Sequence, residues 1–529
     1  MRTLRPSLLA AFGLLCFGTL PAQFGTFDPS FNGTGYVIQP VNNMDGVQRI
    51  VVQPDQKIIT LGMSWDATYT ARAYAFRYLP DGTLDTDFAT DGVFMHELDN
   101  EALLYSAVVK ADGKILLVGA TTDYQKYRIL LIQLNSDGTL DPDFGIGGVV
   151  ARLVSPAGAN AEDMAFDVAL DSEGRILVCG SSHDENYVRR PVVVRFTATG
   201  DLDTTFGDQG VASIPVMAVG SSAFKAFQLQ PDGKIVAAGF FGETELWYTL
   251  LLVRFNADGT LDGTFSDDGI VKHNHGNVDD EAYDLELTAD GSIIVAGKTV
   301  TVDYNYSALL MKFTSTGEVD DTFGDNGAVE EDLDQFDYAW ELELQPDGRI
   351  IMAGTSGEGP PNGFDMAVWK YASDGTRDTD FGNNGLAMPG VPDRYAMIYG
   401  LALQADGQVL VGGQARTENN ENHFLLARLK NDLSNGIADT QELGSALVMP
   451  NPAASGNTIV VRTAGAISAD ARILLHTSDG RLVQTYRATQ YANGIDRIQL
   501  QLPDALSPGA YLLTIQQGGT RSAASILVE

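Results

Sequence analysis

Short apolar runs alternate with turns rich in Asp and Gly along most of this 529-residue chain. The clearest unit, residues 344–385, reads LQPDGRIIMAG, a variable stretch, and then MAVWKYASDGTRDTDFGNNG. Within such a unit the apolar residues recur with a period of two, which is the pattern of half-buried β-strands. Four such runs fit each unit and no window has a helical period, so the pattern predicts an all-β chain built from four-stranded repeats.

The first half of each unit is a hairpin whose turn recurs at a regular spacing. The turn residue falls at Gln56, Gly113, Gly174, Gly233, Gly291, Gly348 and Gly407, with 57 to 61 residues from one to the next. Asp-Gly supplies the positive φ that a tight hairpin turn needs, and Gln56 is the one departure. Seven hairpins at this spacing predict the seven blades of a β-propeller, with a linear solenoid as the alternative.

The second half of each unit carries the motif L-D-x-x-F-G-x-x-G, which leads into a fourth strand. Good copies lie at 81–92, 137–148, 199–210, 258–269, 316–327 and 374–385, and a half-copy stands alone at 27–35. The seventh unit therefore lacks its last strand, and residues 35–39 can supply it. We predict a seven-bladed β-propeller of four-stranded blades, in which an N-terminal strand closes the last blade and leaves no open edge.

The elements QPDGKI-x-x-x-G at 230–239 and LDTTFG-x-x-G at 202–210 recur through the chain. They resemble the delta-60 repeat family of bacterial extracellular propeller-like proteins. The resemblance covers most of the chain and implies a secreted β-propeller, without an activity common to the family. We expect the propeller to span residues 23–440.

The two ends of the chain differ from the repeat. Residues 1–22 carry Arg2 and Arg5, an apolar run and then Pro21-Ala22, which is the order of a secretory signal peptide. After a linker at 441–446, residues 447–529 contain PNPA, then DGRLV, then LSPGAYLL. This succession resembles the C-terminal sorting domain of proteins exported by the type IX secretion system, which implies a small immunoglobulin-like β-sandwich. The resemblance also implies the type IX secretion machinery as a partner, and a secreted or outer-membrane surface location reached through the periplasm.

The acidic balance of the chain narrows its partners. The chain has 69 acidic and 34 basic residues and a formal net charge of -35. Such a charge repels nucleic acid and anionic lipid headgroups, so we expect no nucleic-acid partner. Beyond the N-terminal run no apolar stretch reaches membrane-spanning length, so no transmembrane segment is expected in the mature chain. Cys179 is the one cysteine left after signal removal, and its apolar surroundings predict a core position.

Candidate binding residues lie where the repeat varies. In each blade the turns between strands one and two and between strands three and four share one face, and both carry fixed Asp-Gly motifs. The opposite face takes the segments of variable length, which is the usual division between support and binding. Flat rings among carboxylates suit a glycan or protein ligand, although such rings also pack between blades. The candidates are Trp65, Tyr124, Tyr187, Trp247, Asp280, Glu281, Tyr304 and Tyr395.

Two patterns raise the question of a metal. His273 and His275 point the same way on an extended chain, and with Asp279 nearby they are weak candidates for a metal site. The acids of the L-D-x-x-F-G motif, such as Asp203 and Asp208, invite a calcium interpretation. Turn chemistry is favoured, because no EF-hand spacing is present. No cofactor is expected from the sequence, and calcium is left open.

The sequence has no nucleophile elbow, zinc-binding helix motif, phosphate loop or paired-cysteine site. Together with nearly uniform blades, this favours a non-catalytic binding or adhesion platform that is secreted or held at the cell surface. The alternative is a carbohydrate-active hydrolase or lyase that uses carboxylates at the channel mouth, among Asp163, Asp280, Glu281 and Asp337. Whether the protein is an enzyme stays open, and a non-enzyme is favoured.

Overall fold

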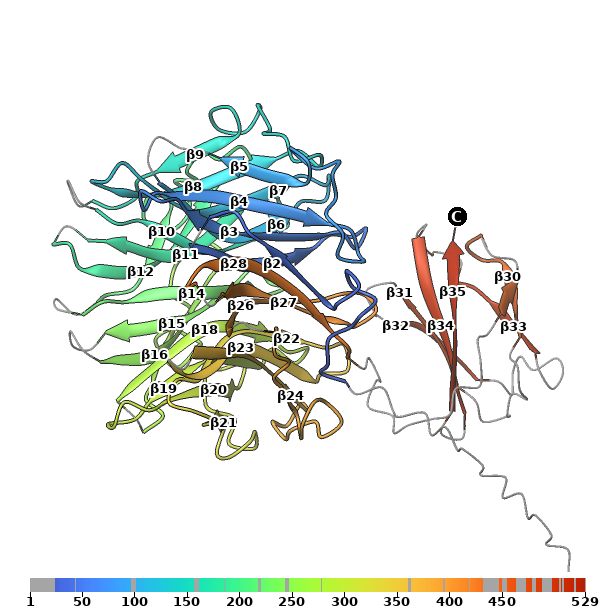
Figure 1. Cartoon of the computed structure of the whole chain (residues 1–529). Coiled ribbons are helices and arrows are strands. Elements are labelled where there is room, and N and C mark those ends of the chain that lie inside the picture. The colour runs from blue at the N-terminus through green and yellow to red at the C-terminus, as the bar shows by residue number, and fades with distance from the viewer. Residues whose placement is uncertain are drawn as a thin grey trace, which may run out of the picture.

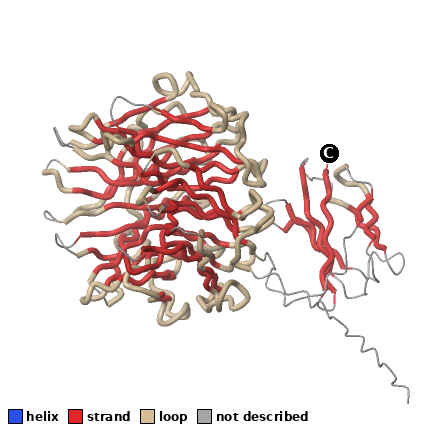
Figure 2. Tube along the Cα trace, viewed as in Figure 1, coloured by secondary structure: helices blue, strands red, loops and turns tan. Residues whose placement is uncertain are grey.

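The computed structural model describes residues 24–431, apart from short gaps at 43, 97–100, 157–160, 185, 217–219, 243–246, 277, 360–362, 393–394 and 418, and then parts of residues 447–528. This described part consists of strands, turns and loops and contains no helix, and thus none that could span a membrane (Figures 1 and 2). The expected signal peptide at 1–22 and the linker at 441–446 lie outside the described residues.

Seven antiparallel four-stranded sheets follow one another along the chain as the blades of a propeller (Figure 1). In each of blades 1 to 6 the four strands are consecutive in the sequence and neighbours in the sheet. The strands are β2 (Met44–Val52), β3 (Ile58–Trp65), β4 (Ala71–Tyr78) and β5 (Val93–His96) in blade 1; β6 (Glu101–Val109), β7 (Ile115–Thr122), β8 (Tyr127–Leu134) and β9 (Val149–Arg152) in blade 2; β10 (Met164–Leu170), β11 (Ile176–His183), β12 (Arg189–Phe196) and β13 (Val211–Ser213) in blade 3; β14 (Ala223–Leu229), β15 (Ile235–Gly242), β16 (Tyr248–Phe255) and β17 (Ile270–His273) in blade 4; β18 (Asp279–Leu287), β19 (Ile293–Val300), β20 (Tyr306–Phe313) and β21 (Ala328–Glu331) in blade 5; β22 (Tyr338–Leu344), β23 (Ile350–Gly359), β24 (Gly363–Tyr371) and β25 (Leu386–Ala387) in blade 6; and β26 (Tyr395–Leu403), β27 (Val409–Arg416) and β28 (Asn422–Leu429) in blade 7.

The seventh blade is completed by the N-terminal part of the chain. β1 (Tyr36–Gln39) pairs antiparallel with β28, with Tyr36 opposite Ala427 and Gln39 opposite Phe424. One parallel pair, Met44 with Asn422, also links this blade to blade 1. The predicted seven-bladed propeller with an N-terminal closing strand is confirmed. The linear solenoid is excluded, because the first and last blades meet and the ring is closed.

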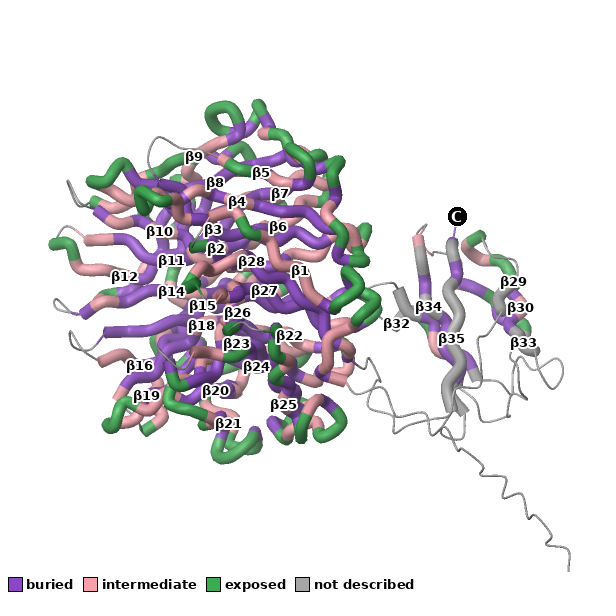
Figure 3. Tube along the Cα trace, viewed as in Figure 1, coloured by how far each residue is buried: buried purple, intermediate pink, exposed green. Residues whose placement is uncertain are grey.

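Apolar side chains fill the spaces between neighbouring blades, where the strands are largely buried (Figure 3). Seven clusters of buried residues occupy these spaces, and each contains one phenylalanine of the repeated motif with an exposed fraction of 0% or 1%. Phe31 of the N-terminal half-copy takes this position between blades 7 and 1. The other six are Phe88, Phe144, Phe206, Phe265, Phe323 and Phe381. Cys179 is also fully buried, as its surroundings predict.

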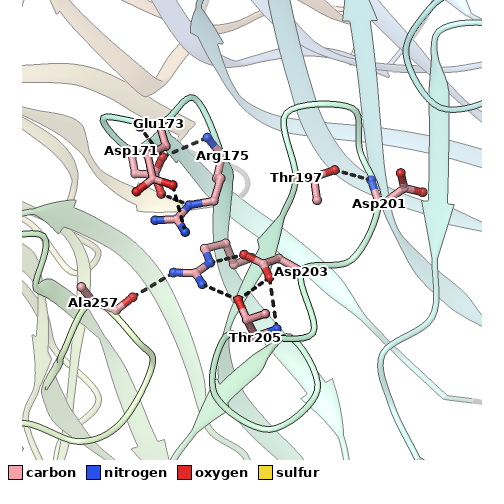
Figure 4. A network of polar contacts seen from close by, with 9 residues as sticks. Asp171, Glu173, Arg175, Thr197, Asp201, Asp203, Thr205 and Ala257 are labelled. Carbon is pink, nitrogen blue, oxygen red and sulfur yellow. Dashed lines mark hydrogen bonds and ion pairs between the residues drawn. The ribbon is translucent and has the colours of Figure 1, made fainter.

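The aspartate of the motif is bound by a cation of the protein itself. Nε of Arg195 donates to Oδ2 of Asp203 at 2.8 Å, and Nη1 of Arg195 donates to the carbonyl of Ala257 in the next blade at 2.8 Å (Figure 4). The hydroxyl and the N–H of Thr205 donate to the other oxygen of Asp203. Arg254 repeats this arrangement one blade further on. In these two copies the motif ties a blade to its neighbour, and its acid serves as a structural acceptor.

The described parts of residues 447–528 contain seven further strands in two sheets. One sheet has the order β29 (Leu447–Met449), β30 (Thr458–Arg462), β33 (Arg497–Gln501), and the other has the order β32 (Leu482–Arg487), β31 (Arg472–Thr477), β34 (Gly509–Gln517), β35 (Thr520–Val528). One buried cluster combines Ile459 and Val461 of the first sheet with Ile473, Leu513 and Ile526 of the second. Two sheets that share one core form the predicted small β-sandwich.

Candidate functional site

The two faces of the propeller carry different connections. The turns from the first to the second strand and from the third to the fourth strand of each blade lie on one face, here called the scaffold face. The connections from the second to the third strand and from one blade to the next lie on the opposite face, here called the variable face. The repeated Asp-Gly motifs therefore do not determine which side chains stand on the variable face.

The same hairpin turn occurs on both faces with different residues. In this turn the first N–H donates to the carbonyl four residues later, and the fourth residue has a positive φ. Among the described residues the scaffold face has thirteen such turns, and the fourth residue is Gly in all of them except at Gln56. The four described on the variable face have Tyr69, Tyr187, Tyr304 and Asn420 there, with φ of 59°, 64°, 60° and 63°. This conformation costs a tyrosine on the order of 1 kcal/mol and a glycine nothing, so turn chemistry does not explain the tyrosines.

These tyrosines are also exposed. The exposed fraction is 72% for Tyr69, 48% for Tyr187 and 58% for Tyr304. Tyr124, which has a φ of 65° in a shorter turn of blade 2, is 64% exposed. Trp247 of blade 4 lies beside Tyr304 of blade 5, with 6.3 Å between the ring centroids. Rings held this way gain little from burial in the protein and remain available to a ligand.

A second group of rings lines the central channel. The innermost strand of every blade has a β-bulge near its middle, and the residues at the bulges are Gln48, Tyr105, Phe166, Lys225, Tyr283, Trp340 and Tyr399. The rings of Tyr283 and Trp340 stack at 4.5 Å, and Trp340 meets Tyr399 at 5.7 Å. Because a bulge redirects a side chain, the same position in blades 5, 6 and 7 brings three aromatic rings together.

The ring contacts continue from the channel toward the variable face. Trp340 stacks on Tyr338 at 5.1 Å, Tyr338 lies 5.6 Å from Tyr306, and Tyr306 lies 5.2 Å from Phe336. Phe336 lies 6.3 Å from Phe364. Every ring in this series of contacts is half-buried. The aromatic cluster is the name used below for the set Tyr283, Tyr306, Phe336, Tyr338, Trp340, Phe364 and Tyr399.

A pocket opens on the variable face next to the aromatic cluster. Its volume is about 240 Å³, and it lies between the β23–β24 hairpin of blade 6 and the strands β26 and β27 of blade 7. Its lining residues are Gly363, Phe364, Tyr395, Met397, Gln414, Arg416 and Asn420. Among these lining residues Arg416 carries the charge, and the others contribute apolar, aromatic or amide groups.

The carboxylates considered for catalysis are engaged within the protein. Asp163 and Asp337 are fully buried, and each accepts two backbone N–H groups of the connection that enters its blade, at 2.6 to 3.0 Å. Asp280 is fully buried and accepts a backbone N–H at 2.7 Å and a threonine hydroxyl at 2.6 Å. Burial raises the pKa of all three, while these hydrogen bonds lower it. Glu281 forms an ion pair with Lys298 at 3.0 Å. The three aspartates hold loops in place, and Glu281 pairs with Lys298 across β18 and β19.

The residues considered for a metal site do not converge. The rings of His273 and His275 lie 6.2 Å apart, and Nε2 of His275 is 2.8 Å from Oε1 of Glu330. Asp279 instead pairs with Lys298 at 3.2 Å. Within the residues that the structure describes, no three His, Cys, Asp or Glu side chains are arranged to hold a metal ion.

The candidates from the sequence are spread over the variable face. Trp65, which is half-buried, ends β3 in blade 1, while Tyr124 and Tyr187 lie on turns of blades 2 and 3. Trp247 and Tyr304 come together, and Tyr395 joins the pocket. Sequence reasoning missed the aromatic cluster and Arg416. In an alignment of the seven repeats the bulge positions fall in one column, and the aromatic residues in that column would indicate the aromatic cluster.

A protein-family model matches the repeat. The model of a family described as a domain of unknown function (DUF5122) beta-propeller matches seven segments, residues 53–88, 110–144, 172–206, 230–265, 288–323, 345–381 and 404–434. The first six segments end at or next to a motif phenylalanine, so the connections between blades fall outside them. No curated protein matches the chain.

Solved structures with a similar chain path are distant in sequence. A fungal alcohol oxidase in complex with copper is 13% identical with a TM-score of 0.46, and the match covers 93% of this chain and 98% of the oxidase. An ulvan lyase bound to a sugar ligand is 10% identical with a TM-score of 0.44, over 75% of this chain and 96% of the lyase. An arabinanase of Bacillus subtilis is 12% identical with a TM-score of 0.30, over 62% and 94%.

Proposed function

We propose that this seven-bladed β-propeller, whose repeats match the DUF5122 model, is a non-catalytic platform that binds glycans on its variable face. The observation that carries the proposal is the presence of Tyr69, Tyr187 and Tyr304 in a turn where the same chain otherwise uses glycine. A strained, exposed ring is explained when it contacts a ligand. Because each ring stands on a short hydrogen-bonded hairpin, little backbone entropy is lost on binding.

The chemistry of these rings favours sugars. A sugar ring presents C–H groups on its faces and hydroxyls at its edge, so it packs flat on tyrosine and tryptophan while polar groups stay in water. Trp247 and Tyr304 stand on two neighbouring blades. Further inward, the aromatic cluster extends from blade 5 to blade 7. A glycan long enough to touch several platforms gains avidity, which suits adhesion to a surface that displays many copies of the glycan.

Binding fits the variable face better than hydrolysis does. A glycosidase needs two carboxylates that face a substrate across roughly 5 to 10 Å. Asp163, Asp280 and Asp337 are fully buried and hold backbone N–H groups, and Glu281 is paired with Lys298. These acids are therefore occupied by roles within the fold.

The proposed location outside the cell rests on the ends of the sequence. Residues 1–22 act as a signal peptide, and residues 447–529 act as the sorting domain that the type IX secretion machinery recognises. The mature protein is then secreted or attached to the outer-membrane surface. Deleting residues 447–529 should leave the protein in the periplasm, which cell fractionation measures against a periplasmic marker. Secretion of the shortened chain at the level of the full chain would contradict this assignment.

A glycan array tests the binding proposal with the chain from residue 23 onward. The triple variant Tyr69→Asn, Tyr187→Asn, Tyr304→Asn keeps a residue that the chain itself uses in this turn, at Asn420. We expect its affinity for the selected glycan to fall roughly tenfold or more, since each ring contributes about 1 kcal/mol.

The control variant for this experiment is Ile146→Asn. Ile146 is 90% exposed on the scaffold face, so its loss removes an exposed apolar side chain and should leave binding unchanged. Silence of the wild-type chain on the whole array, or equal binding by the wild-type chain and the triple variant, would overturn the proposal.

A further inference from the structure

One wall of the pocket between blades 6 and 7 is a ladder of side chains across two strands. Tyr395 pairs with Arg416 and Met397 pairs with Gln414, so all four side chains stand on one face of the blade 7 sheet. Phe364 of blade 6 completes the pocket. Its volume of about 240 Å³ lies below the roughly 300 to 1,000 Å³ of sites for drug-sized ligands, so the pocket fits a single sugar ring.

Arg416 has no ion-pair partner in this pocket among the residues that the structure describes. In the described part of the chain its Nε atom is buried without a hydrogen-bond partner, and no carboxylate forms an ion pair with it. A buried donor without a partner costs about 1 to 3 kcal/mol, and a ligand that accepts from it removes that cost. The planar guanidinium is also the donor group that best matches a carboxylate, because two parallel N–H groups meet its two oxygens.

The remaining lining groups match a sugar. Tyr395 is 43% exposed, and its ring lies against Gly363, where an added Cβ would come within 2.0 Å of a ring atom. Gly363 therefore allows the ring to stand in the pocket with its remaining surface free. Asn420 supplies an amide group that both donates and accepts hydrogen bonds, which suits sugar hydroxyls. Nε2 of Gln414 already donates to Tyr399 and Met397, so Gln414 offers its Oε1 as an acceptor.

We infer that this pocket binds a hexuronic acid residue of a glycan, with the carboxylate on Arg416 and the sugar ring on Tyr395. The inference rests on the proposed glycan binding and names the class of sugar that this one pocket takes. The net charge of -35 weakens binding of an acidic glycan, but at ~0.1 M salt charges more than about 10 Å away are largely screened, while Arg416 touches the ligand.

Isothermal titration of the chain from residue 23 onward with the trimer of galacturonic acid and with its methyl ester tests the inference. The ester keeps the shape of the trimer and removes the charge, so it should bind about tenfold or more weakly. Arg416→Gln should weaken binding of the acid by a similar factor and leave binding of the ester unchanged. Arg416→Lys should bind the acid more tightly than Arg416→Gln but less tightly than the wild-type chain. Lysine keeps the positive charge but lacks the two parallel N–H groups of the guanidinium.

Arg152→Gln is the matched control, because Arg152 is exposed on β9 of blade 2 and lies outside the pocket. It should bind the acid as the wild-type chain does, and circular dichroism confirms that each variant is folded. Equal affinity for acid and ester, or unchanged binding of the acid by Arg416→Gln, would overturn the inference. If neutral glycans bind through the turn tyrosines while the acid does not bind, the inference fails and the proposed function stands. If no glycan binds, the proposed function fails as well.

Discussion

Nη2 of Arg49 lies 3.3 Å from Oδ1 of Asp167, which joins blade 1 to blade 3 across the central channel. The same guanidinium contacts Glu341 of blade 6 through Nη1. Asp167 also accepts the hydroxyl of Ser106 in blade 2 at 2.8 Å and the N–H of Phe227 in blade 4 at 3.3 Å. Two ion pairs of Arg49 and two hydrogen bonds of Asp167 therefore connect five blades at the centre of the ring.

Replacing Arg49 by Met should destabilise the propeller, because Asp167 and Glu341 would lose their cation. Removing one partner of a buried pair costs roughly 3 to 5 kcal/mol, and because the Arg49 side chain is 27% exposed we expect about 2 kcal/mol. Urea unfolding of the full chain from residue 23 measures the change. Arg128→Met is the control, since Arg128 pairs with Asp123 at the surface and should matter much less. Equal effects of the two substitutions would contradict the role given to Arg49.

Two glutamates at equivalent positions of blades 5 and 6 make the channel sensitive to pH. Burial, followed by repulsion from Glu343 and Asp284, raises the pKa of Glu286 to about 9, although Arg49 acts against it. Burial and then Asp284 raise the pKa of Glu343 to about 7. Glutamates in an unfolded chain release their protons near pH ~4.3, so the folded propeller keeps protons that the unfolded chain has lost.

Stability should therefore fall as the pH rises from about 4.5 toward about 9, because a raised carboxyl pKa stabilises the fold only while the proton is kept. Glu286→Gln carries a neutral side chain at every pH, so it should flatten this decline. Urea midpoints at about pH 5, 7 and 9 measure the slope. Glu318→Gln on an exposed turn should keep the wild-type slope. Parallel slopes for Glu286→Gln and the wild-type chain would show that Glu286 does not retain its proton.

The sequence was sufficient for the blades because their contacts are local. Hairpins join adjacent strands, and neighbouring blades are one repeat apart, so a regular spacing carries most of the fold. The half-copy at 27–35 was enough to predict the closing strand, because its Phe31 marks the place of the seventh copy. Even the departure at Gln56 keeps the positive φ of the turn, at 67°.

The candidate site could be predicted where it lies on turns or at the ends of strands, as Tyr395 does at the start of β26. Tyr124, Tyr187 and Tyr304 stand in short local segments that the repeat leaves free. Trp340 and Tyr399 lie inside strands, and they line the channel because a bulge shifts the alternation by one residue. Nothing in a pattern of apolar and polar residues marks such a shift. The pocket around Arg416 likewise depends on how two blades pack against each other.

The closing half-copy should contribute as much stability as a complete motif. Phe31 and Phe206 are both fully buried, and arginines lie over the two rings at 4.8 Å and 4.6 Å. Phe31→Ala and Phe206→Ala should each cost about 3 to 5 kcal/mol, which unfolding in urea measures. Phe364→Ala should cost less because Phe364 is half-buried. A small effect of Phe31→Ala beside a large effect of Phe206→Ala would mean that the N-terminal segment adds little to the ring.

Exchanging tyrosine and glycine between turns of the two faces should change the stability of the fold in a predictable direction. Tyr69→Gly relieves a left-handed backbone at a ring that is 72% exposed, so the thermal midpoint should stay the same or rise, even though glycine also loosens the unfolded chain. Gly174→Tyr places a tyrosine in the same turn on the scaffold face, where an added Cβ meets no atom within 4 Å. Strain alone then acts, and the free energy of unfolding should fall by about 1 kcal/mol. A loss of stability in Tyr69→Gly as large as that in Gly174→Tyr would mean that the ring of Tyr69 serves the fold, and the argument for a ligand on the variable face would lose its main support.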